Sequence, residues 1–193
     1  MIIIFCGQKG GTGKTTLSYL VAETLARAGK RVAIRDDDPQ ASVTQIVSEL
    51  REAEKTEVEL LDGQSVEMFD FVVVDTLPRL SSRVLIEAVK EADRLILPLK
   101  PSMVDIRATL PAVEMVKENT RPDARAFVLW NMVKQGTRIS RELKTLEGMI
   151  GLPVLKNTMP ERIGFNYATL QGFEALGMED RDMLQRLVLE FLV

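Results

Sequence analysis

The sequence contains no histidine and only one cysteine, Cys6. The absence of histidine excludes imidazole ligands for metals and histidine general bases. A single cysteine cannot form a disulfide within the chain, which fits a reducing cytoplasm. Because Cys6 ends an apolar run, we expect its thiol to be packed in the core and not to be reactive.

Long apolar runs, a net positive charge and abundant aromatic residues are also missing. No run is long enough to span a bilayer, and the apolar opening at residues 2–6 leads straight into a glycine-rich loop, without the features of a signal peptide. The formal net charge of −3 restricts any nucleic-acid contact to a local basic patch. Aromatic residues, 5% of the chain, are not interleaved with basic ones, which argues against a single-strand binding surface.

What is present is the balance of an ordinary globular chain, with 46% hydrophobic and 27% charged residues over 193 positions. This length suits one domain, residues 1–193, with a sizeable core. Apolar runs alternate with segments of helical spacing, which predicts a doubly wound, mostly parallel sheet flanked by helices. We expect strands at 2–6, 31–35, 58–61, 69–75, 92–98, 124–130 and 151–155, and later helices at 81–92, 106–117, 137–150 and 180–193.

Residues 7–16, GQKGGTGKTT, predict a phosphate-binding loop, which we call the phosphate loop. Its four glycines let successive backbone N–H groups point at one anion, and the following helix adds its positive end. In such loops a lysine, here Lys14, reaches the terminal phosphates, and the next hydroxyl, here Thr15, binds Mg²⁺. Gln8 stands where the common pattern has a glycine, and a second lysine, Lys9, stands at the loop entrance.

Acidic residues follow two of the predicted strands. Asp36, Asp37 and Asp38 come after the second strand, and Asp75 ends the fourth. Three acids in a row are most often a solvated loop, and one aspartate after an apolar run is common. Because ligands of open α/β sheets bind at the carboxyl ends of strands, we expect these acids beside the phosphate loop. We also expect Asp38 to cap the next helix and Pro39 to lie in its first turn.

The phosphate loop resembles the deviant Walker A motif, K-G-G-x-G-K-[ST]-T, of the ParA/MinD family of P-loop ATPases, and the chain looks most like the short ParA-type partition proteins. Residues 36–40 are similar to the family's D-x-D-P-Q motif, and residues 92–105 to its A-D-x-hhh-P-x-x-P-S-x-x-D run. Where the family has D-T-P-P, residues 75–78 read D-T-L-P, which puts the shape of the following loop in doubt. The resemblance covers nearly the whole chain.

The resemblance implies an ATPase that uses ATP and Mg²⁺. It implies Mg²⁺ roles for Thr15, Asp36 and Asp75, directly or through water. The nucleotide contacts that it implies are Gly10, Gly11, Thr12, Gly13, Lys14, Thr15, Thr16, Asn131 and Pro160.

Three residues are the catalytic set that the resemblance implies. Lys14 would neutralise the γ-phosphate, and Asp38 would position the attacking water. The family forms an ATP-dependent homodimer in which the entrance lysine, here Lys9, reaches the nucleotide of the partner subunit.

Asn131 follows the strand at 124–130 and matches the asparagine that binds the adenine edge in the family. An amide offers a donor and an acceptor together, which suits adenine. The alternative is a turn-forming asparagine after a strand. The neighbouring Trp130 is expected in the core.

The predicted helix at 137–150 carries a basic stripe. By 3.6-residue counting, Arg138, Arg141 and Lys144 fall opposite a stripe of apolar residues. Such a stripe is most often a solvated face, but non-specific duplex binding also needs lysine and arginine facing phosphates. These three residues, with Arg162 from the loop that resembles the family's proline-arginine loop, are the candidate DNA contacts.

The segment 180–193 has apolar positions at helical spacing but acidic flanks, so we expect it to pack on the core and not on anionic lipid. The resemblance implies a cytoplasmic, nucleoid-associated partition ATPase without a membrane partner. Its ATP-bound homodimer would bind DNA non-specifically, and a centromere-binding partner protein would stimulate hydrolysis and so segregate plasmid or chromosome DNA. Three alternatives stay open: a MinD-like or orphan ATPase that positions a protein cargo or membrane complex, a metabolic P-loop enzyme, and a nucleotide-gated binding module with negligible hydrolysis.

Overall fold

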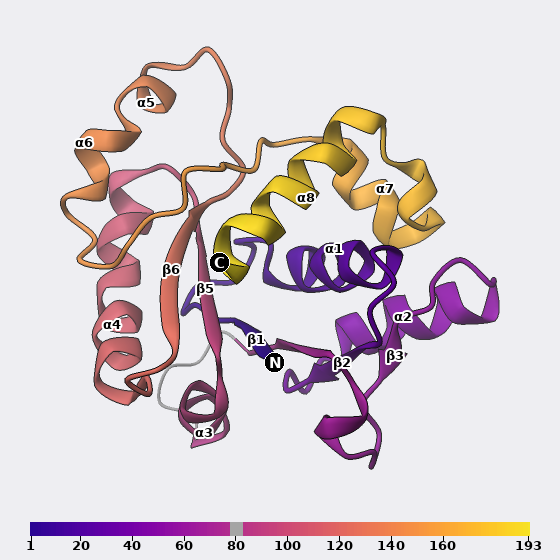
Figure 1. Cartoon of the computed structure of the whole chain (residues 1–193). Helices are drawn as coiled ribbons and strands as arrows, with labels where there is room; N and C mark the ends of the chain where they lie inside the picture. Colours follow the sequence, from indigo (N-terminus) through magenta and orange to yellow (C-terminus); the bar gives the residue numbers. More distant parts are fainter. Residues whose placement is uncertain (78–82) are drawn as a thin grey trace.

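The protein is described from a computed structural model that covers residues 1–77 and 83–193 (Figure 1). Six parallel strands form one sheet in the order β3-β2-β4-β1-β5-β6. This confirms the predicted doubly wound parallel sheet. The strands are β1 (Ile2–Phe5), β2 (Val32–Asp36), β3 (Glu59–Leu60), β4 (Phe71–Asp75), β5 (Arg94–Leu99) and β6 (Arg125–Trp130).

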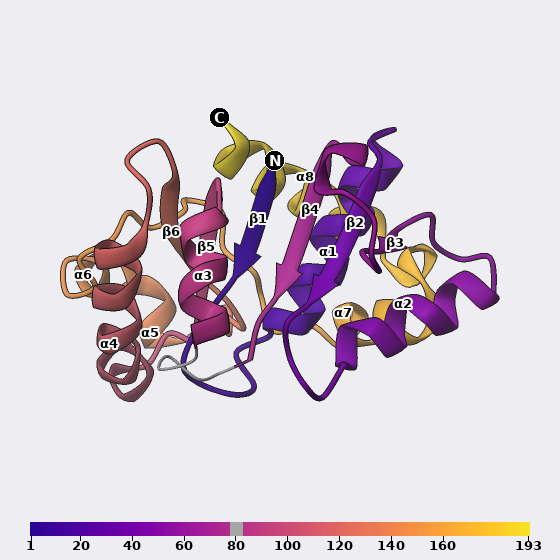
Figure 2. The same cartoon turned by 90° about the horizontal axis from the view of Figure 1, so that it is seen from below.

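Helices cover both faces of the sheet (Figures 1 and 2). Helices α1 (Lys14–Arg27), α2 (Ser42–Glu52), α7 (Ile163–Gln171) and α8 (Met178–Leu192) bury their apolar sides in one core cluster, together with the short helix η2 (Phe173–Ala175). Helices α3 (Arg83–Glu91), α4 (Met103–Asn119) and α6 (Leu143–Glu147) contribute to the cluster on the other face. The short helices α5 (Arg138–Arg141) and η1 (Val66–Met68) lie in connections.

Strand β1 shows how the sequence divides between the two cores. Ile3 and Phe5 belong to the cluster under α1, whereas Ile4 and Cys6 belong to the opposite cluster. Both faces of a central parallel strand are buried, which explains its unbroken apolar run. Burial also raises the pKa of the Cys6 thiol to about 12, so Cys6 is the inert core residue that we predicted.

Helix α1 connects two distant regions of the molecule. Its apolar residues, which include Leu17 and Leu20, are buried. The helix ends where Gly29 adopts a φ of 77° and the Lys30 N–H donates to the Leu25 carbonyl over 3.3 Å. This is the Schellman arrangement that a glycine after a helix favours. At a rise of 1.5 Å per residue the helix spans roughly 20 Å from the phosphate loop to this end.

Helix α8 packs on the core, as predicted. Leu184, Leu187 and Phe191 are fully buried in the cluster that includes α1. The apolar side of this helix is therefore occupied within the chain. Among the described residues, no helix combines the length and the apolar character needed to cross a bilayer.

The predicted helix at 137–150 is wrong: the chain forms α5 and α6 with a break at Glu142, where φ is −101° and ψ is 5°. Thr137 caps α5 by accepting from the Ser140 N–H over 3.3 Å, and the Ser140 hydroxyl donates to the Thr137 carbonyl over 2.7 Å. Thr137 is thus the N-cap of α5, and α6 begins separately after Glu142. The basic residues therefore do not form one stripe along one helix.

Two further boundaries differ from the predictions. Residues 151–155 make one parallel bridge, between Val128 and Val154, where a strand was predicted; the neighbouring Pro153 has no N–H for a ladder. Helix α4 begins at Met103, before the predicted start, and continues through Pro111. The helix predicted at 81–92 appears as α3, while residues 81 and 82 and Pro78 of the loop in doubt lie outside the described residues.

Candidate functional site

The predicted site residues meet at the carboxyl ends of β1, β2 and β4. Phe5 of β1 and Asp36 of β2 are both register partners of Asp75, at the end of β4. Because the phosphate loop continues from β1, the loop and the two acids share one edge of the sheet. This is the edge at which open α/β sheets bind ligands.

Lys14 lies inside the phosphate loop and is only 6% exposed. Its Nζ donates to the Lys9 carbonyl over 3.3 Å. Burial lowers the pKa of Lys14, and the nearby carboxylates of Asp75 and Asp38 oppose that shift. The ammonium therefore faces a backbone carbonyl where an anion would be a stronger partner.

Gly13 and Asn131 fit each other closely. Gly13 has a φ of 89°, and a Cβ at this position would lie 2.4 Å from Asn131 Nδ2, so the loop needs glycine here. Asn131 Nδ2 donates to the Thr12 carbonyl over 2.7 Å. The structure thus brings Asn131 to the phosphate loop, and in this conformation its amide bonds to the loop backbone.

Asp75 is a buried carboxylate, 1% exposed, that lies beside hydroxyl groups. Ser18 Oγ donates to it over 3.3 Å. Burial raises the pKa of Asp75 to about 6, and the proximity of Asp36 adds to this, while hydrogen bonds from Thr15 and Ser18 oppose it. A cation would favour the ionised form of such a group.

The oxygen atoms of Asp75 and of the nearby hydroxyl groups are suitable ligands for Mg²⁺, which prefers hard oxygen ligands. In the described part of the chain, no three histidine, cysteine, aspartate or glutamate side chains lie close enough to hold a metal by themselves. Magnesium usually binds through one or two carboxylates and completes its shell with water and substrate phosphates. One buried aspartate with Thr15 nearby suits that mode.

Asp36 also holds the chain that follows β2. Its Oδ2 accepts from the Thr44 N–H over 3.0 Å and from the Thr44 hydroxyl over 2.9 Å, and its Oδ1 accepts from the Asp38 N–H over 3.0 Å. Asp36 therefore satisfies a backbone N–H in the first turn of α2 and fixes the loop at 36–44.

The prediction that Asp38 caps α2 is wrong. The helix begins at Ser42, after Ala41 with a φ of 51°, and Pro39 lies outside it. The Asp38 carboxylate accepts from the Gln40 N–H over 3.0 Å, in a turn of its own. Asp38 is thus held before the helix, on the side of the phosphate loop.

Two cavities border the phosphate loop. A cavity of about 720 Å³ lies between this loop and residues 38–42, with Lys14, Thr15 and Asp38 among its lining residues. A smaller one, about 100 Å³, is lined by Thr16, Asn131 and Pro160 among others. The structure therefore brings together the residues predicted for phosphate and those predicted for the base.

Three residues of this region were not predicted from the sequence. Met132, with a φ of 55°, borders both cavities. Ser18 lies one helical turn after Lys14 and Thr15, a spacing that could have indicated its place beside Asp75. Thr44 carried no signal, because its contact with Asp36 depends on the course of the loop.

The candidate DNA contacts do not form one cluster. Arg138 Nε pairs with Glu142 over 2.9 Å, and Arg141 and Lys144 are exposed. Arg162 pairs with Glu179 at 2.9 Å and with Asp180 at 2.5 Å. Helices α5 and α6 lie apart from α7, which Arg162 precedes, in both views (Figures 1 and 2).

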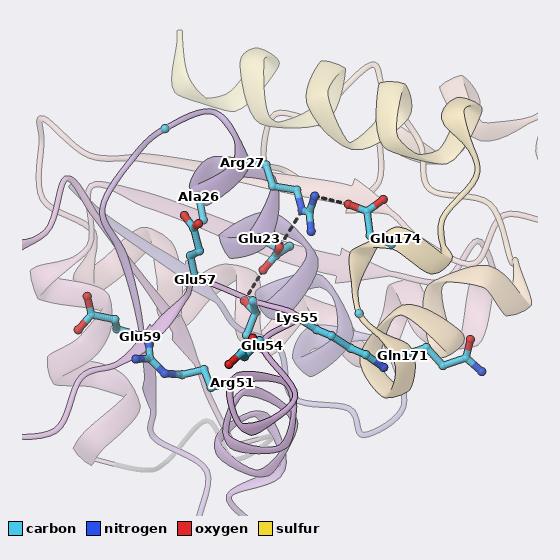
Figure 3. Close-up of a pocket in the computed structure, with 13 residues that line it drawn as sticks. Glu23, Ala26, Arg27, Arg51, Glu54, Lys55, Glu57, Glu59, Gln171 and Glu174 are labelled. Atoms are coloured by element: carbon cyan, nitrogen blue, oxygen red, sulfur yellow. Dashed lines mark hydrogen bonds and ion pairs between the residues drawn. The ribbon is translucent and has the colours of Figure 1, made fainter.

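A separate cavity, about 1020 Å³, lies at the other end of α1 (Figure 3). Its lining comes from residues 23–29, 51–59 and 171–174, which include none of the predicted site residues. Glu23, Arg27 and Glu174 form a chain of ion pairs along its wall. Size alone therefore does not mark the candidate nucleotide site in this molecule.

Comparisons with known proteins agree with this geometry. The family described as the CobQ/CobB/MinD/ParA nucleotide binding domain matches residues 3–173. The chain is 28% identical over 176 residues to maintenance of carboxysome distribution protein A from Halothiobacillus neapolitanus, across 85% of this chain and 81% of that protein. It is 23% identical over 180 residues to protein ParA from Rhizobium radiobacter, across 86% and 80% of the two chains.

A solved structure shares the fold. The putative plasmid partition protein of Borrelia burgdorferi, bound to AMPPNP, has a TM-score of 0.76 at 19% identity, across 99% of this chain and 98% of that one. The phosphate loop, the two acids at the sheet edge and the family match over most of the sequence show that this chain belongs to the ParA/MinD family of nucleotide-binding domains.

Proposed function

We propose that the protein is a Mg²⁺-dependent ATPase of the ParA type, in which residues 1–193 act as one domain. In this proposal two ATP-bound copies form a dimer that binds DNA non-specifically, and hydrolysis releases it. The observation that carries the proposal is the cavity of about 720 Å³ that gathers Lys14, Thr15 and Asp38 beside buried Asp75. Phosphoryl transfer needs chiefly positioning and charge, which this set supplies.

Each residue has a task that follows from its place. Lys14 would exchange the Lys9 carbonyl for the terminal phosphates, a stronger partner for an ammonium. Asp38 would orient the attacking water from the opposite wall of the cavity. Thr15 and Asp75 would hold Mg²⁺, with Asp36 as an outer support. When bound, Mg²⁺ neutralises charge on the phosphate oxygens.

The base would lie in the smaller cavity. Asn131 and Pro160 line it, and Asn131 can offer a donor and an acceptor to adenine when its amide leaves the Thr12 carbonyl. Gly10, Gly11, Gly13 and Thr16 would surround the phosphates with backbone N–H groups. ATP is thus the nucleotide that we propose.

The proposed cargo is DNA, and a centromere-binding partner protein would stimulate hydrolysis. The likeness to protein ParA of Rhizobium radiobacter supports this proposal. In this role the protein would be cytoplasmic and associated with the nucleoid. The buried apolar side of α8 argues against a lipid surface as partner.

A second candidate function is the positioning of a protein cargo. The likeness to maintenance of carboxysome distribution protein A, at 28% identity across 85% of this chain, favours it. Both candidates use the same ATP switch and differ in what the partner protein connects to the dimer. Plasmid loss after deletion of the gene would favour DNA segregation, whereas misplacement of a protein assembly with stable plasmids would favour the second candidate.

The test of the proposed function is ATP-dependent retention on non-specific duplex DNA across salt concentrations. We expect Asp38→Ala to bind ATP, dimerise and stay on DNA, with retention falling steeply as salt rises. Undiminished ATP turnover in Asp38→Ala would show that Asp38 does not orient the attacking water. DNA retention that is equal with ATP, with ADP and without nucleotide would contradict the switch.

The candidate DNA contacts can be tested in the same assay. Replacing both Arg141 and Lys144 by alanine should weaken retention and reduce the salt slope by about 1 for each phosphate that is no longer neutralised. A matched control replaces Lys30 and Lys55, which lie at the far end of α1, and leaves retention unchanged. Equal decreases in both double variants would show that net charge and not α5–α6 determines binding.

A further inference from the structure

Lys9 is tied into its own subunit at two points. Its Nζ forms an ion pair with the carboxylate of Asp105, which lies in the first turn of α4, 96 positions along the chain. Its carbonyl accepts from Lys14 Nζ over 3.3 Å and from Thr12 Oγ1 over 3.5 Å. The backbone of Lys9 is thus held by the phosphate loop, and its ammonium is held by α4.

The carboxylate of Asp105 is itself held in place. The Asp105 N–H donates to Ser102 Oγ over 3.0 Å, and the Ser102 hydroxyl donates back to the carboxylate, which together cap α4. Asp105 is 8% exposed. Burial by itself raises the pKa of Asp105, but the hydrogen bonds from Lys9 and Ser102 and the charge of Lys9 outweigh it and hold the pKa below its usual value. The carboxylate is therefore ionised and fixed in orientation.

We propose that Asp105 is a positioning residue that keeps Lys9 within its own subunit until ATP and a second copy of the chain compete for the ammonium. This inference rests on the proposed function, in which Lys9 serves the nucleotide of the partner. One ammonium cannot lie on Asp105 and reach across a dimer at once. The ion pair therefore opposes the ATP-bound dimer, and Asp105 sets the ATP concentration at which dimers form.

The Lys9–Asp105 ion pair contributes twice to the free energy of dimer formation, because it must break in both subunits. A partly exposed ion pair is worth up to a factor of about five in an equilibrium constant. Opening two such pairs changes the dimer dissociation constant by up to roughly 25-fold. Dimer formation against ATP concentration, measured by light scattering, is sensitive to a change of this size.

Asp105→Asn is the decisive variant, since it removes the charge but keeps an oxygen to which Ser102 can donate. We expect it to dimerise at lower ATP than the parent protein, with a dissociation constant about 5- to 25-fold lower. Asp105→Glu, which restores the charge, should move the midpoint back toward the parent value. Asp93→Asn, which removes one of the carboxylates that pair with Arg121 elsewhere in the protein, is the control for net charge and should leave the midpoint unchanged.

Two outcomes separate this proposal from the proposed function. If Lys9→Ala dimerises with ATP as the parent does, Lys9 has no role across the dimer and that part of the proposed function fails. If Lys9→Ala stays monomeric while Asp105→Asn dimerises no more readily than the parent, the role of Asp105 is wrong and the proposed function stands.

A second measurement keeps the proposal testable if Asp105→Asn does not fold. In the nucleotide-free parent protein, acetylation of Lys9 should be several-fold slower than that of exposed Lys30, followed by mass spectrometry. Addition of a non-hydrolysable ATP analogue should change the rate at Lys9 and leave Lys30 alone. Equal rates at Lys9 and Lys30 without nucleotide would overturn the ion pair.

Discussion

Buried charged side chains lie near both ends of α1, but the two groups of side chains have different partners. At the far end, Glu23 is 2% exposed, and its carboxylate accepts from Arg27 Nε over 2.8 Å and from the Thr56 hydroxyl. At the phosphate loop, the ammonium of Lys14 faces a backbone carbonyl, and the Asp75 carboxylate faces the Ser18 hydroxyl. At the far end, opposite charges pair with each other. At the phosphate loop, the charged groups contact a neutral carbonyl and a neutral hydroxyl, which are weaker partners.

The far end continues as a network that joins several elements (Figure 3). Arg27 pairs with Glu174 at 2.5 Å, and Arg181 pairs with the same carboxylate at 2.7 Å. Both guanidinium groups lie over the ring of Phe173, at 5.1 and 5.7 Å from its centroid. The hydrogen bond from Arg181 and the charge of Arg27 lower the pKa of Glu174.

The difference between the two ends shows in the pKa values of their charged groups. At the far end the carboxylate of Glu174 is stabilised in its ionised form. At the phosphate loop, burial lowers the pKa of Lys14 and raises that of Asp75 to about 6, so both charged forms are disfavoured. Groups perturbed by burial at a sheet edge are characteristic of functional sites.

Lys14→Ala should have the largest effect on function. We expect ATP affinity to fall by more than about 100-fold, because the variant removes a charge-assisted hydrogen bond to phosphate in a buried loop. The free energy of unfolding should stay the same or rise, since a poorly satisfied ammonium is removed. A fluorescent ATP analogue titration with thermal unfolding checks both, and normal ATP affinity would contradict the site.

Glu23→Gln should give the opposite pattern. We expect the free energy of unfolding to fall by about 3 kcal/mol, because the buried Glu23 carboxylate loses its charge and with it two charge-assisted hydrogen bonds, from Arg27 and Thr56, while Arg27 keeps its pair with Glu174. ATP affinity should change by less than about twofold, since the residue lies about two helical turns beyond the loop. Chemical denaturation and the same titration measure these. Loss of ATP binding in a folded Glu23→Gln variant would show that the two ends are not independent.

Asp75→Asn should have a pH-dependent effect on stability, opposite in sign to that of Glu23→Gln at neutral pH. The folded pKa of about 6 lies above the ordinary aspartate pKa of 3.8, so between these values the folded chain binds more protons than the unfolded chain. This group therefore destabilises the fold as pH rises through the window, by about 3 kcal/mol at pH 7.5. Without Mg²⁺, Asp75→Asn should be more stable than the parent at pH 7.5 and equal to it near pH 4.

Thermal unfolding at several pH values checks the prediction for Asp75. The same variant should lose the stabilisation that Mg²⁺ and ATP together give the parent protein. If the parent protein instead becomes more stable relative to Asp75→Asn as pH rises, the sign is reversed. That result would contradict a carboxylate whose pKa is raised by burial.

The sheet and the phosphate loop could be predicted because their signals are local. Apolar runs such as residues 2–6 and the spacing of glycines and lysines lie within a few positions. The break at Glu142 could not be predicted from helical counting, because the apolar residues of 137–150 keep their helical spacing across it.

Contacts between residues far apart in the sequence could not be predicted either. Asn131 and Thr12 lie 119 positions apart, and Lys9 and Asp105 lie 96 apart. The resemblance to the family pointed to Asn131 and Lys9 but not to their partners in this conformation. The place of Asp38 was misjudged for a related reason: its carboxylate closes a turn with Gln40, and α2 starts later.

The most direct test of the account is the molar mass of two variants with ATP and Mg²⁺, measured by light scattering. Asp38→Ala should double in mass when ATP is added, because in the proposed function this variant would bind nucleotide without hydrolysing it. Adding Lys9→Ala to this variant should return the mass to that of one chain while ATP still binds. A single-chain mass for Asp38→Ala in saturating ATP, or a dimer that persists without Lys9, would contradict the proposed switch.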